Sequence, residues 1–332
     1  MSNKKLSVLI PVFNEEGNIA AIVDAIRIVF EQLPPYDHEI LFVNDGSIDA
    51  SLQVIKRMAA VNPRVKFISF SRNFGKDNAL LAGCRYATGD AVITMDADLQ
   101  HPPELIPEML GLWESGNDVV YAYRADRNRH VGKLNQLTSR AFYKLVNALS
   151  DVKLEDGISD YRLLDKKVVV TLNQLPEERP FFRGLVKWVG FQQVGIPYTP
   201  AARASGETKY SQRALARLAL QGITSFSVKP LQIAIYLGFG FSLIPLLYIP
   251  YVLYSFYHHL AISGWASLIM TVLFFGGLQL MILGILGVYL GKLFTQSKQR
   301  PQFIVQETNA GCEAAGQESS YSSFSELMVV GA

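Results

Sequence analysis

Two carboxylates follow an apolar, β-branched run in the first third of the chain. Asp96 and Asp98 come at the end of the run 90–95, and side chains two residues apart on a strand share one face, so both can bind one ligand. Hard cations such as Mg²⁺ are often held by one or two carboxylates together with substrate phosphates. Gln100 could add an amide oxygen or bind through water. The pattern indicates a metal–diphosphate site; the alternative is two aspartates that only cap and solvate a strand end, since Asp is common in turns.

Short β-branched runs alternate with amphipathic segments of helical length in the first part of the chain. The predicted strands are residues 6–12, 39–43, 65–69 and 90–95, and the predicted helices are residues 18–32, 48–60 and 76–87. This alternation predicts parallel strand pairs with right-handed crossovers and helices on both faces. The expected fold class is therefore α/β, a Rossmann-like sandwich.

Sheets of this kind bind ligands beyond the carboxyl ends of their strands. The segments that follow the four predicted strands are all polar: residues 11–16, 44–47, 71–75 and 96–100. Asp45, in the second of them, adds a third carboxylate and favours the metal–diphosphate interpretation. No G-x-G-x-x-G follows the first strand and no G-x-x-x-x-G-K-[ST] occurs anywhere, so the phosphates must be held in another way.

A second part of the chain is apolar throughout. No Asp, Glu, Lys or Arg occurs from Pro230 to Gly291. Residues 231–257 and 265–291 each exceed the ~20 residues that cross a bilayer, so they predict a two-helix transmembrane hairpin. The link between them has no Lys or Arg, whereas basic residues flank the pair: Arg213, Arg217, Lys229, Lys292, Lys298 and Arg300. By the positive-inside rule both ends are expected in the cytoplasm.

The remaining composition excludes several classes of protein. Residues 1–5 lead directly into a predicted strand and not into a long apolar segment, so we expect the first part to stay in the cytosol. Cys84 and Cys312 predict neither a disulfide framework nor a metal cluster. A net charge of +2 argues against a nucleic-acid partner, because nucleic-acid binders usually carry a concentrated basic face.

Six ordered motifs give the chain a family resemblance. They are residues 10–16 (IPVFNEE), 43–47 (VNDGS), 71–76 (SRNFGK), 95–100 (MDADLQ), 159–163 (SDYRL) and 206–210 (GETKY). From Ser7 to about Pro301 the chain resembles the inverting family 2 glycosyltransferases of GT-A fold. Within them it is similar to the polyprenyl-phosphate glycosyltransferases, such as dolichyl-phosphate mannose synthases and bactoprenol glucosyltransferases. It departs from the bactoprenol group at Ser159, where glycine is usual.

The resemblance implies a role for each matched residue. The nucleoside would lie among Pro11, Phe13, Glu15 and Asp45, and the metal (Mg²⁺ or Mn²⁺) and diphosphate among Asp96, Asp98 and Gln100. Asp160 would lie beside the reacting centre, Arg162 would bind phosphate, and Lys209 would supply a cation from a mobile loop. The catalytic set expected on this basis is Asp160, Asp98 and Arg162, with Asp96 and Lys209 also contacting the nucleotide-sugar.

The resemblance also divides the chain into segments. We expect a cytosolic GT-A domain in 1–210, a juxtamembrane amphipathic helix in 211–229, two transmembrane helices in 230–292 and a cytosolic tail in 293–332, largely disordered after 307. Residues 181–189 also have the spacing of an amphipathic helix, which either lies in the membrane interface or belongs to the core.

A prenyl phosphate acceptor would be largely ionised at neutral pH, because its second pKa is near ~6 by analogy with phosphoserine. It therefore hardly needs a base, and we expect Asp160 to position a substrate or to stabilise positive charge on the sugar ring. The metal, Arg162 and Lys209 would stabilise the leaving diphosphate. Candidate ligands for the acceptor phosphate are Arg72, Arg124 and Arg203, each of which could instead be a solvated surface charge.

The expected activity is sugar transfer from a nucleotide-sugar, with UDP-glucose preferred, to undecaprenyl or polyprenyl phosphate at a bacterial inner membrane. UDP-N-acetylhexosamine, a modified pentose donor and GDP-mannose remain alternative donors. A processive polysaccharide synthase and a non-catalytic nucleotide-sugar-binding scaffold are less favoured. A second copy of the chain, a flippase and a downstream glycosyltransferase are left open as partners.

Overall fold

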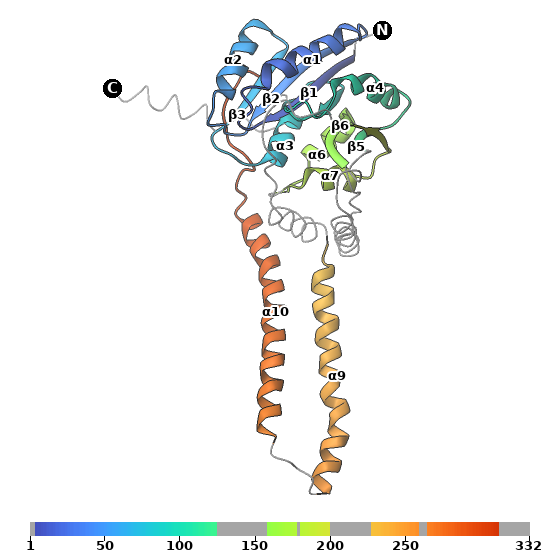
Figure 1. The fold of residues 1–332 in the computed structure, drawn as a ribbon, viewed down its shortest axis with the longest axis vertical. Helices are drawn as coiled ribbons and strands as arrows, with labels where there is room; N and C mark the ends of the chain where they lie inside the picture. The colour runs from blue at the N-terminus through green and yellow to red at the C-terminus, as the bar shows by residue number, and fades with distance from the viewer. Residues whose placement is uncertain (1–3, 125–157, 178–179, 200–226, 259–263, 312–332) are drawn as a thin grey trace, which may run out of the picture. The chain divides into compact units, whose positions relative to one another are not determined.

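The computed structural model describes residues 4–124, 158–177, 180–199, 227–258 and 264–311 (Figure 1). The chain divides into two compact units, each of which is described by itself. Arg203, Lys209, the predicted helix segment 211–226 and the tail from residue 312 lie outside the described residues.

The first unit is built on a mixed sheet, which in the described residues has eight strands in the order β7-β5-β6-β4-β1-β2-β3-β8. The strands are β1 (Lys4–Val12), β2 (Tyr36–Asn44), β3 (Val65–Phe70), β4 (Ala91–Thr94), β5 (Val119–Arg124), β6 (Ile158–Asp165), β7 (Gln193–Tyr198) and β8 (Val305–Thr308). The four predicted strands are confirmed as β1 to β4, and they pair in parallel. β6 runs antiparallel to β4 and β5, and β8 runs antiparallel to β3. The order β3-β2-β1-β4 puts a topological switch between β1 and β4, where open α/β sheets bind ligands.

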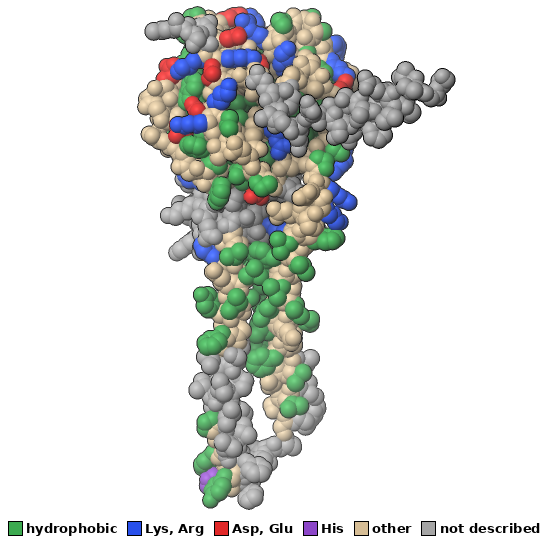
Figure 2. All heavy atoms as spheres, turned by 180° about the vertical axis from the view of Figure 1, so that it is seen from behind, with side chains coloured by type: hydrophobic (Ala, Val, Ile, Leu, Met, Phe, Trp, Pro, Cys, Tyr) green, Lys and Arg blue, Asp and Glu red, His purple; other side chains and the backbone are tan. Residues whose placement is uncertain are grey.

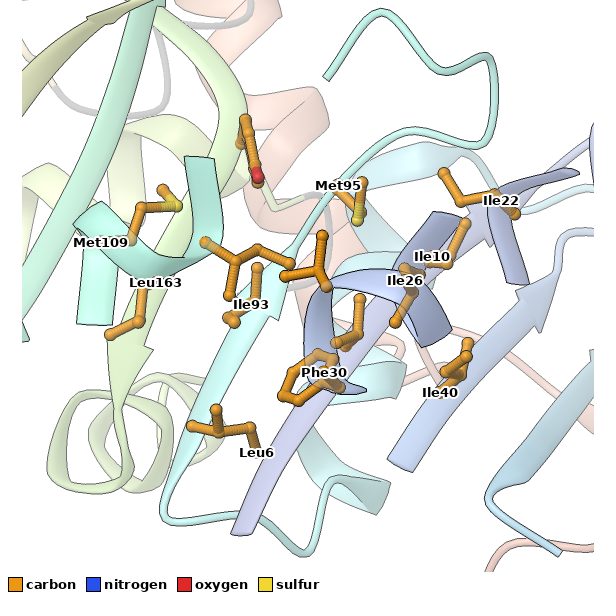
Figure 3. Close-up of a cluster of buried hydrophobic side chains, with 14 of the residues drawn as sticks. Leu6, Ile10, Ile22, Ile26, Phe30, Ile40, Ile93, Met95, Met109 and Leu163 are labelled. Atoms are coloured by element: carbon orange, nitrogen blue, oxygen red, sulfur yellow. The ribbon is translucent and has the colours of Figure 1, made fainter. Parts of the chain in front are cut away.

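Helices pack on the sheet as the alternating pattern predicts. They are α1 (Ile19–Glu31), α2 (Ser51–Val61), α3 (Lys76–Tyr86), the 3₁₀ turn η1 (Pro103–Leu105), α4 (Ile106–Glu114), α6 (Lys166–Asn173) and α7 (Phe182–Trp188). The three predicted helices correspond to α1, α2 and α3. Every second residue of β1, such as Leu6 and Ile10, packs with Ile22 and Ile26 of α1 and with Met109 of α4 in one buried cluster (Figure 3).

The other face of β1 packs against α3. Leu9 points away from the cluster of Leu6 and Ile10, and its side chain lies directly over Gly83 of α3. A Cβ atom at residue 83 would overlap the Leu9 methyl groups, so glycine lets α3 lie close to the sheet. This close packing fixes the position of the first residue of α3, Lys76.

The second unit contains two long helices, α9 (Lys229–Tyr257) and α10 (Trp265–Ser297). The predicted spans 231–257 and 265–291 lie inside them. Within the described residues, Phe274–Ser297, with 24 residues, is long and apolar enough to cross a membrane; an 18-residue window of it has a mean hydropathy of 1.8. Hydrophobic side chains cover much of the described surface of both helices (Figure 2). α10 extends beyond the predicted span end at 292.

The chain after α10 contains a strand that the sequence analysis does not predict. β8 pairs with the edge strand β3, and Asn309 brackets Phe67 through its backbone and side chain. Phe303 stacks on Phe70 with ring centroids 5.1 Å apart, and Lys56 forms an ion pair of 2.6 Å with Glu307. The segment 302–309 is therefore part of the α/β unit, although it was assigned to the tail.

Candidate active site

The carboxylate of Asp45 joins the loops that follow β2 and β3. Its side chain is buried and accepts backbone N–H groups from Phe74 (2.6 Å) and Gly75 (2.9 Å). Burial raises the pKa of Asp45, because these two hydrogen bonds offset the loss of water only in part. Gly46, with φ of 66°, lies against the backbone of Arg72. Asp45 thus fixes the loop that carries Phe74 and leads into α3.

The loops after β1 and β2 are also joined. Asn14 adopts a positive φ of 56°, its backbone N–H donates to the Ser47 hydroxyl, and its side-chain oxygen accepts from Ile48. Glu15 accepts a hydrogen bond from Asn18 at 2.6 Å. Pro11 is the penultimate residue of β1, and the ring of Phe13 is 40% exposed. Of the predicted nucleoside-binding residues, Phe13, Glu15 and Asp45 therefore lie on these joined loops, and Pro11 lies at the end of β1 beside them.

Asp96, Asp98 and Gln100 follow β4 at the same edge of the sheet. One Asp98 oxygen accepts the backbone N–H of Gln100 at 3.1 Å across a turn in which Leu99 has φ of 60°. The Gln100 amide oxygen accepts from Arg124 at 3.2 Å, and Asp96 accepts the ammonium of Lys76 at 2.5 Å. These three predicted metal ligands are oxygen donors on one short segment.

The donor set fits a hard divalent cation. Two carboxylates and an amide oxygen are ligands that Mg²⁺ and Mn²⁺ accept. Among the described residues no group of three His, Cys, Asp or Glu side chains converges on one point. Asp96, Asp98 and Gln100 therefore match the donor chemistry of such a cation.

Asp160 lies at the centre of a row of four charged groups. It is 4% exposed on β6 and accepts two hydrogen bonds from the Arg183 guanidinium, at 2.6 and 2.7 Å. The Lys76 ammonium lies 2.8 Å from Oδ2 of Asp160, the oxygen that also accepts from Arg183, and it bridges to Asp96. The order of charges is Asp96, Lys76, Asp160, Arg183.

The alternation of charge decides which groups are ionised. Burial alone would raise the pKa of Asp160, but Arg183 and Lys76 hold it well below its usual range. Burial lowers the pKa of Lys76, and the two carboxylates more than offset this and raise it. Asp160 is therefore ionised and fully engaged, so it is poorly suited to accept a proton.

Lys76 and Arg183 are not among the site residues predicted from the sequence. Lys76 is the last residue of the motif 71–76, and Arg183 lies in the amphipathic segment 181–189; neither was assigned a role in the site. In the structure Phe182, Leu185 and Val186 of that segment are buried and Trp188 is exposed, so of the two alternatives the structure favours the core.

α3 holds the start of α7 directly. The carboxylate of Asp77 accepts the backbone N–H of Phe182 at 3.0 Å, and burial raises the pKa of Asp77 to about 6. Lys76 and Arg183, the neighbours of these two residues, are thereby brought to the same carboxylate. No local pattern could show this pairing, because it depends on the packing of two helices that are distant in sequence.

His101 is a further residue that the sequence analysis left unassigned. It is 2% exposed, and its Nδ1 accepts the backbone N–H of Asp96 at 2.9 Å. Its ring stacks on Tyr161 with centroids 5.1 Å apart. Burial lowers the pKa of His101 although Asp96 is near, so the neutral ring holds the backbone of Asp96 in place.

The predicted arginines differ in their surroundings. Arg162 is buried two residues from Asp160, on the same face of β6, and its Nε donates to the Ser159 carbonyl. Arg124 is exposed at the end of β5 and contacts Gln100. Arg72 is exposed and lies 3.9 Å from the ring centroid of Phe74.

Ser159, the departure from the bactoprenol group, is built into the sheet. Its hydroxyl donates to the Ala122 carbonyl at 2.9 Å and accepts the backbone N–H of Tyr161. The register between β5 and β6 shifts here, between Tyr121 and Tyr123. The serine therefore bridges an irregularity in the strand pair beside Asp160.

Comparison with known proteins supplies the family. Residues 7–172 match Glycosyl transferase family 2. The chain is 43% identical over 303 residues to an uncharacterised glycosyltransferase, YkcC, of Bacillus subtilis (strain 168), covering 91% of this chain and 93% of that protein. It is 41% identical over 308 residues to the SfII prophage-derived bactoprenol glucosyl transferase of Shigella flexneri, covering 92% and 99%.

A solved structure is also similar. Glucosyl-3-phosphoglycerate synthase from Mycobacterium tuberculosis, in complex with phosphoglyceric acid, aligns with 18% identity and a TM-score of 0.45, over 67% of this chain and 79% of that chain. The family match and the mixed α/β sheet with its polar carboxyl edge confirm the GT-A fold that the motifs implied. The chain belongs to glycosyl transferase family 2.

Proposed function

We propose that this chain transfers a sugar from a nucleotide-sugar, with UDP-glucose as the first candidate, to undecaprenyl or another polyprenyl phosphate. The observation that carries the proposal is the row Asp96, Lys76, Asp160 and Arg183 beside the oxygen ligands after β4. A protein that only binds nucleotide-sugars would not need a buried, doubly paired carboxylate at this place. The name of the Shigella relative supports a bactoprenol acceptor and a glucosyl donor.

The reaction is a single displacement with inversion. An oxygen of the acceptor phosphate forms a bond to the anomeric carbon, the bond from that carbon to the diphosphate oxygen breaks, and nucleoside diphosphate leaves. In this proposal Asp96, Asp98 and Gln100 hold Mg²⁺ or Mn²⁺. The metal would neutralise charge on the departing diphosphate.

The protein side chains orient and stabilise the reacting groups. Because an ionised acceptor needs no base, Asp160 orients the sugar or the acceptor, or stabilises positive charge on the ring. Arg162, together with Lys209 outside the described residues, would bind the phosphates of the donor. Pro11, Phe13, Glu15 and Asp45 would surround the nucleoside.

The lipid acceptor phosphate is assigned to exposed arginines. Arg124, at the end of β5, is the first candidate because it already contacts the metal-ligand segment through Gln100. Arg72 and, outside the described residues, Arg203 are the others. Arg124→Ala is expected to raise the acceptor KM about 10-fold or more while the donor KM changes little. The measurement is steady-state kinetics with each substrate varied in turn; equal increases in both KM values would remove Arg124 from this role.

We further propose that α9 and α10 cross a bacterial inner membrane, with the α/β unit and both chain ends in the cytoplasm. The support is the apolar stretch Phe274–Ser297 and the basic residues that flank the uncharged region. The product would be a polyprenyl-phosphate sugar that donates to cell-envelope glycans. A homo-oligomer, a flippase and a downstream glycosyltransferase are the partners such a product implies.

The decisive experiment identifies the donor. Purified full-length protein is incubated with undecaprenyl phosphate, Mg²⁺ or Mn²⁺, and a panel of radiolabelled nucleotide-sugars, and label in the lipid phase is counted. We expect label with one donor, lost with EDTA and at least about 100-fold lower in Asp98→Ala. Label from another donor in the panel would correct the sugar alone. Nucleotide binding without lipid labelling would favour the scaffold alternative and overturn the proposed reaction.

A further inference from the structure

The ammonium group of Lys76 occupies the place where positive charge is needed in the proposed metal site. It lies 2.5 Å from Asp96 and 2.8 Å from Asp160. Lys76 is the first residue of α3, and the loop before it is held by the buried carboxylate of Asp45. Its position is therefore set by the fold.

Lys76 and a divalent cation cannot both be close partners of the same Asp96 carboxylate without cost. Cations about 4 Å apart repel each other strongly at the effective dielectric of a partly buried site. Asp160 offers the ammonium a second anchor, which Arg183 keeps fixed by two hydrogen bonds. The ammonium can thus leave Asp96 and stay in the site.

We infer that Lys76 is a resident counter-cation that competes with the divalent metal for Asp96. Without donor it neutralises Asp96 and Asp160 and weakens metal binding. The diphosphate of the donor adds negative charge, so that metal and ammonium are both accommodated only when the nucleotide-sugar is present. The consequence is that metal and donor bind together and not one long before the other. This inference rests on the proposed function, because it takes Asp96 and Asp98 as metal ligands.

The test measures metal binding in the absence of donor. Purified full-length protein in detergent is titrated with Mn²⁺, and free Mn²⁺ is followed by its electron paramagnetic resonance signal. Lys76→Met and Lys76→Gln are each expected to bind Mn²⁺ about 10-fold more tightly than the unchanged protein. The glutamine variant keeps a hydrogen-bond donor of similar length, so it tests the charge and not the loss of the side chain.

A matched control removes one positive charge elsewhere. Lys167 pairs with Asp118 at an exposed position, and Lys167→Met is expected to bind Mn²⁺ as the unchanged protein does. Adding Asp98→Ala to Lys76→Met should abolish the tighter binding, which shows that the signal comes from this site.

The outcomes separate the two claims. Mn²⁺ binding that depends on Asp98 but is unchanged or weakened in both Lys76 variants would overturn the inference and leave the proposed metal site intact. If Mn²⁺ binding does not depend on Asp98 in any variant, with or without UDP, the metal site of the proposed function fails, and the inference fails with it. Equal tightening in Lys167→Met would assign the effect to net charge and also overturn the inference.

Discussion

Replacing Asp160 by asparagine is expected to lower kcat for sugar transfer by at least about 100-fold. The carboxylate is bonded by the Arg183 guanidinium and paired with the Lys76 ammonium. Asparagine keeps the size and one oxygen acceptor but loses this charge, so Arg183 and Lys76 each lose a charged partner at Asp160, and Lys76 is drawn toward Asp96. Steady-state kinetics with both substrates saturating is the measurement, and the donor KM is expected to change far less than kcat.

A double variant separates catalysis from folding. Asp160→Asn alone leaves an excess of positive charge. We expect this to lower the stability by about 2–4 kcal/mol, because breaking a buried ion pair is strongly destabilising, and the partial exposure of the two cations limits the loss. Asp160→Asn with Arg183→Met removes that excess and should recover part of the unfolding midpoint but none of the kcat. Activity that returns together with stability would mean that Asp160 serves the fold and not the reaction.

Local patterns were enough to predict the elements that carry the site. The β-branched runs predicted β1 to β4 correctly, and the amphipathic segments between them predicted the helices. Both predictions succeed because the hydrophobic period and the flanking turn residues lie within a few residues of each other. Asp45, Asp96 and Asp98 could be placed at one edge because parallel strands end together. The uncharged stretches likewise predicted α9 and α10 with ends close to those observed.

The charge pairing within the site could not be predicted in this way. The segment 181–189 has the same amphipathic period whether it lies on a membrane or on the core, and only its packing against α3 brings Arg183 to Asp160. β8 could not be predicted either, because its four residues, Val305–Thr308, are of mixed polarity and show no strand period. It forms because β3 offers an unpaired edge and Phe303 finds Phe70.

Gly46→Ala is expected to destabilise the α/β unit by more than about 3 kcal/mol, because it combines backbone strain with a direct overlap. Gly46 has φ of 66°, and a Cβ atom there would overlap the carbonyl carbon of Arg72 and lie 2.6 Å from the backbone nitrogen of Asn73. Neither contact belongs to a flexible side chain, so the loop after β3 must move. That movement would pull Phe74 and Gly75 from Asp45, and the affinity for the nucleotide should fall together with the thermal midpoint.

Gly116→Ala is the matched control for the strain alone. Gly116 also has a positive φ, 103°, but a Cβ atom there meets nothing within 4 Å. It should therefore cost only about 1–2 kcal/mol and leave nucleotide affinity unchanged. Since about 1 kcal/mol shifts the midpoint by roughly 2–4 °C in a domain of this size, the two variants should be clearly separable by thermal unfolding. If Gly46→Ala and Gly116→Ala have equal thermal midpoints and equal nucleotide affinities, the loop after β3 can move at little cost in free energy. Asp45 would then hold the two loops together without depending on the turn at Gly46.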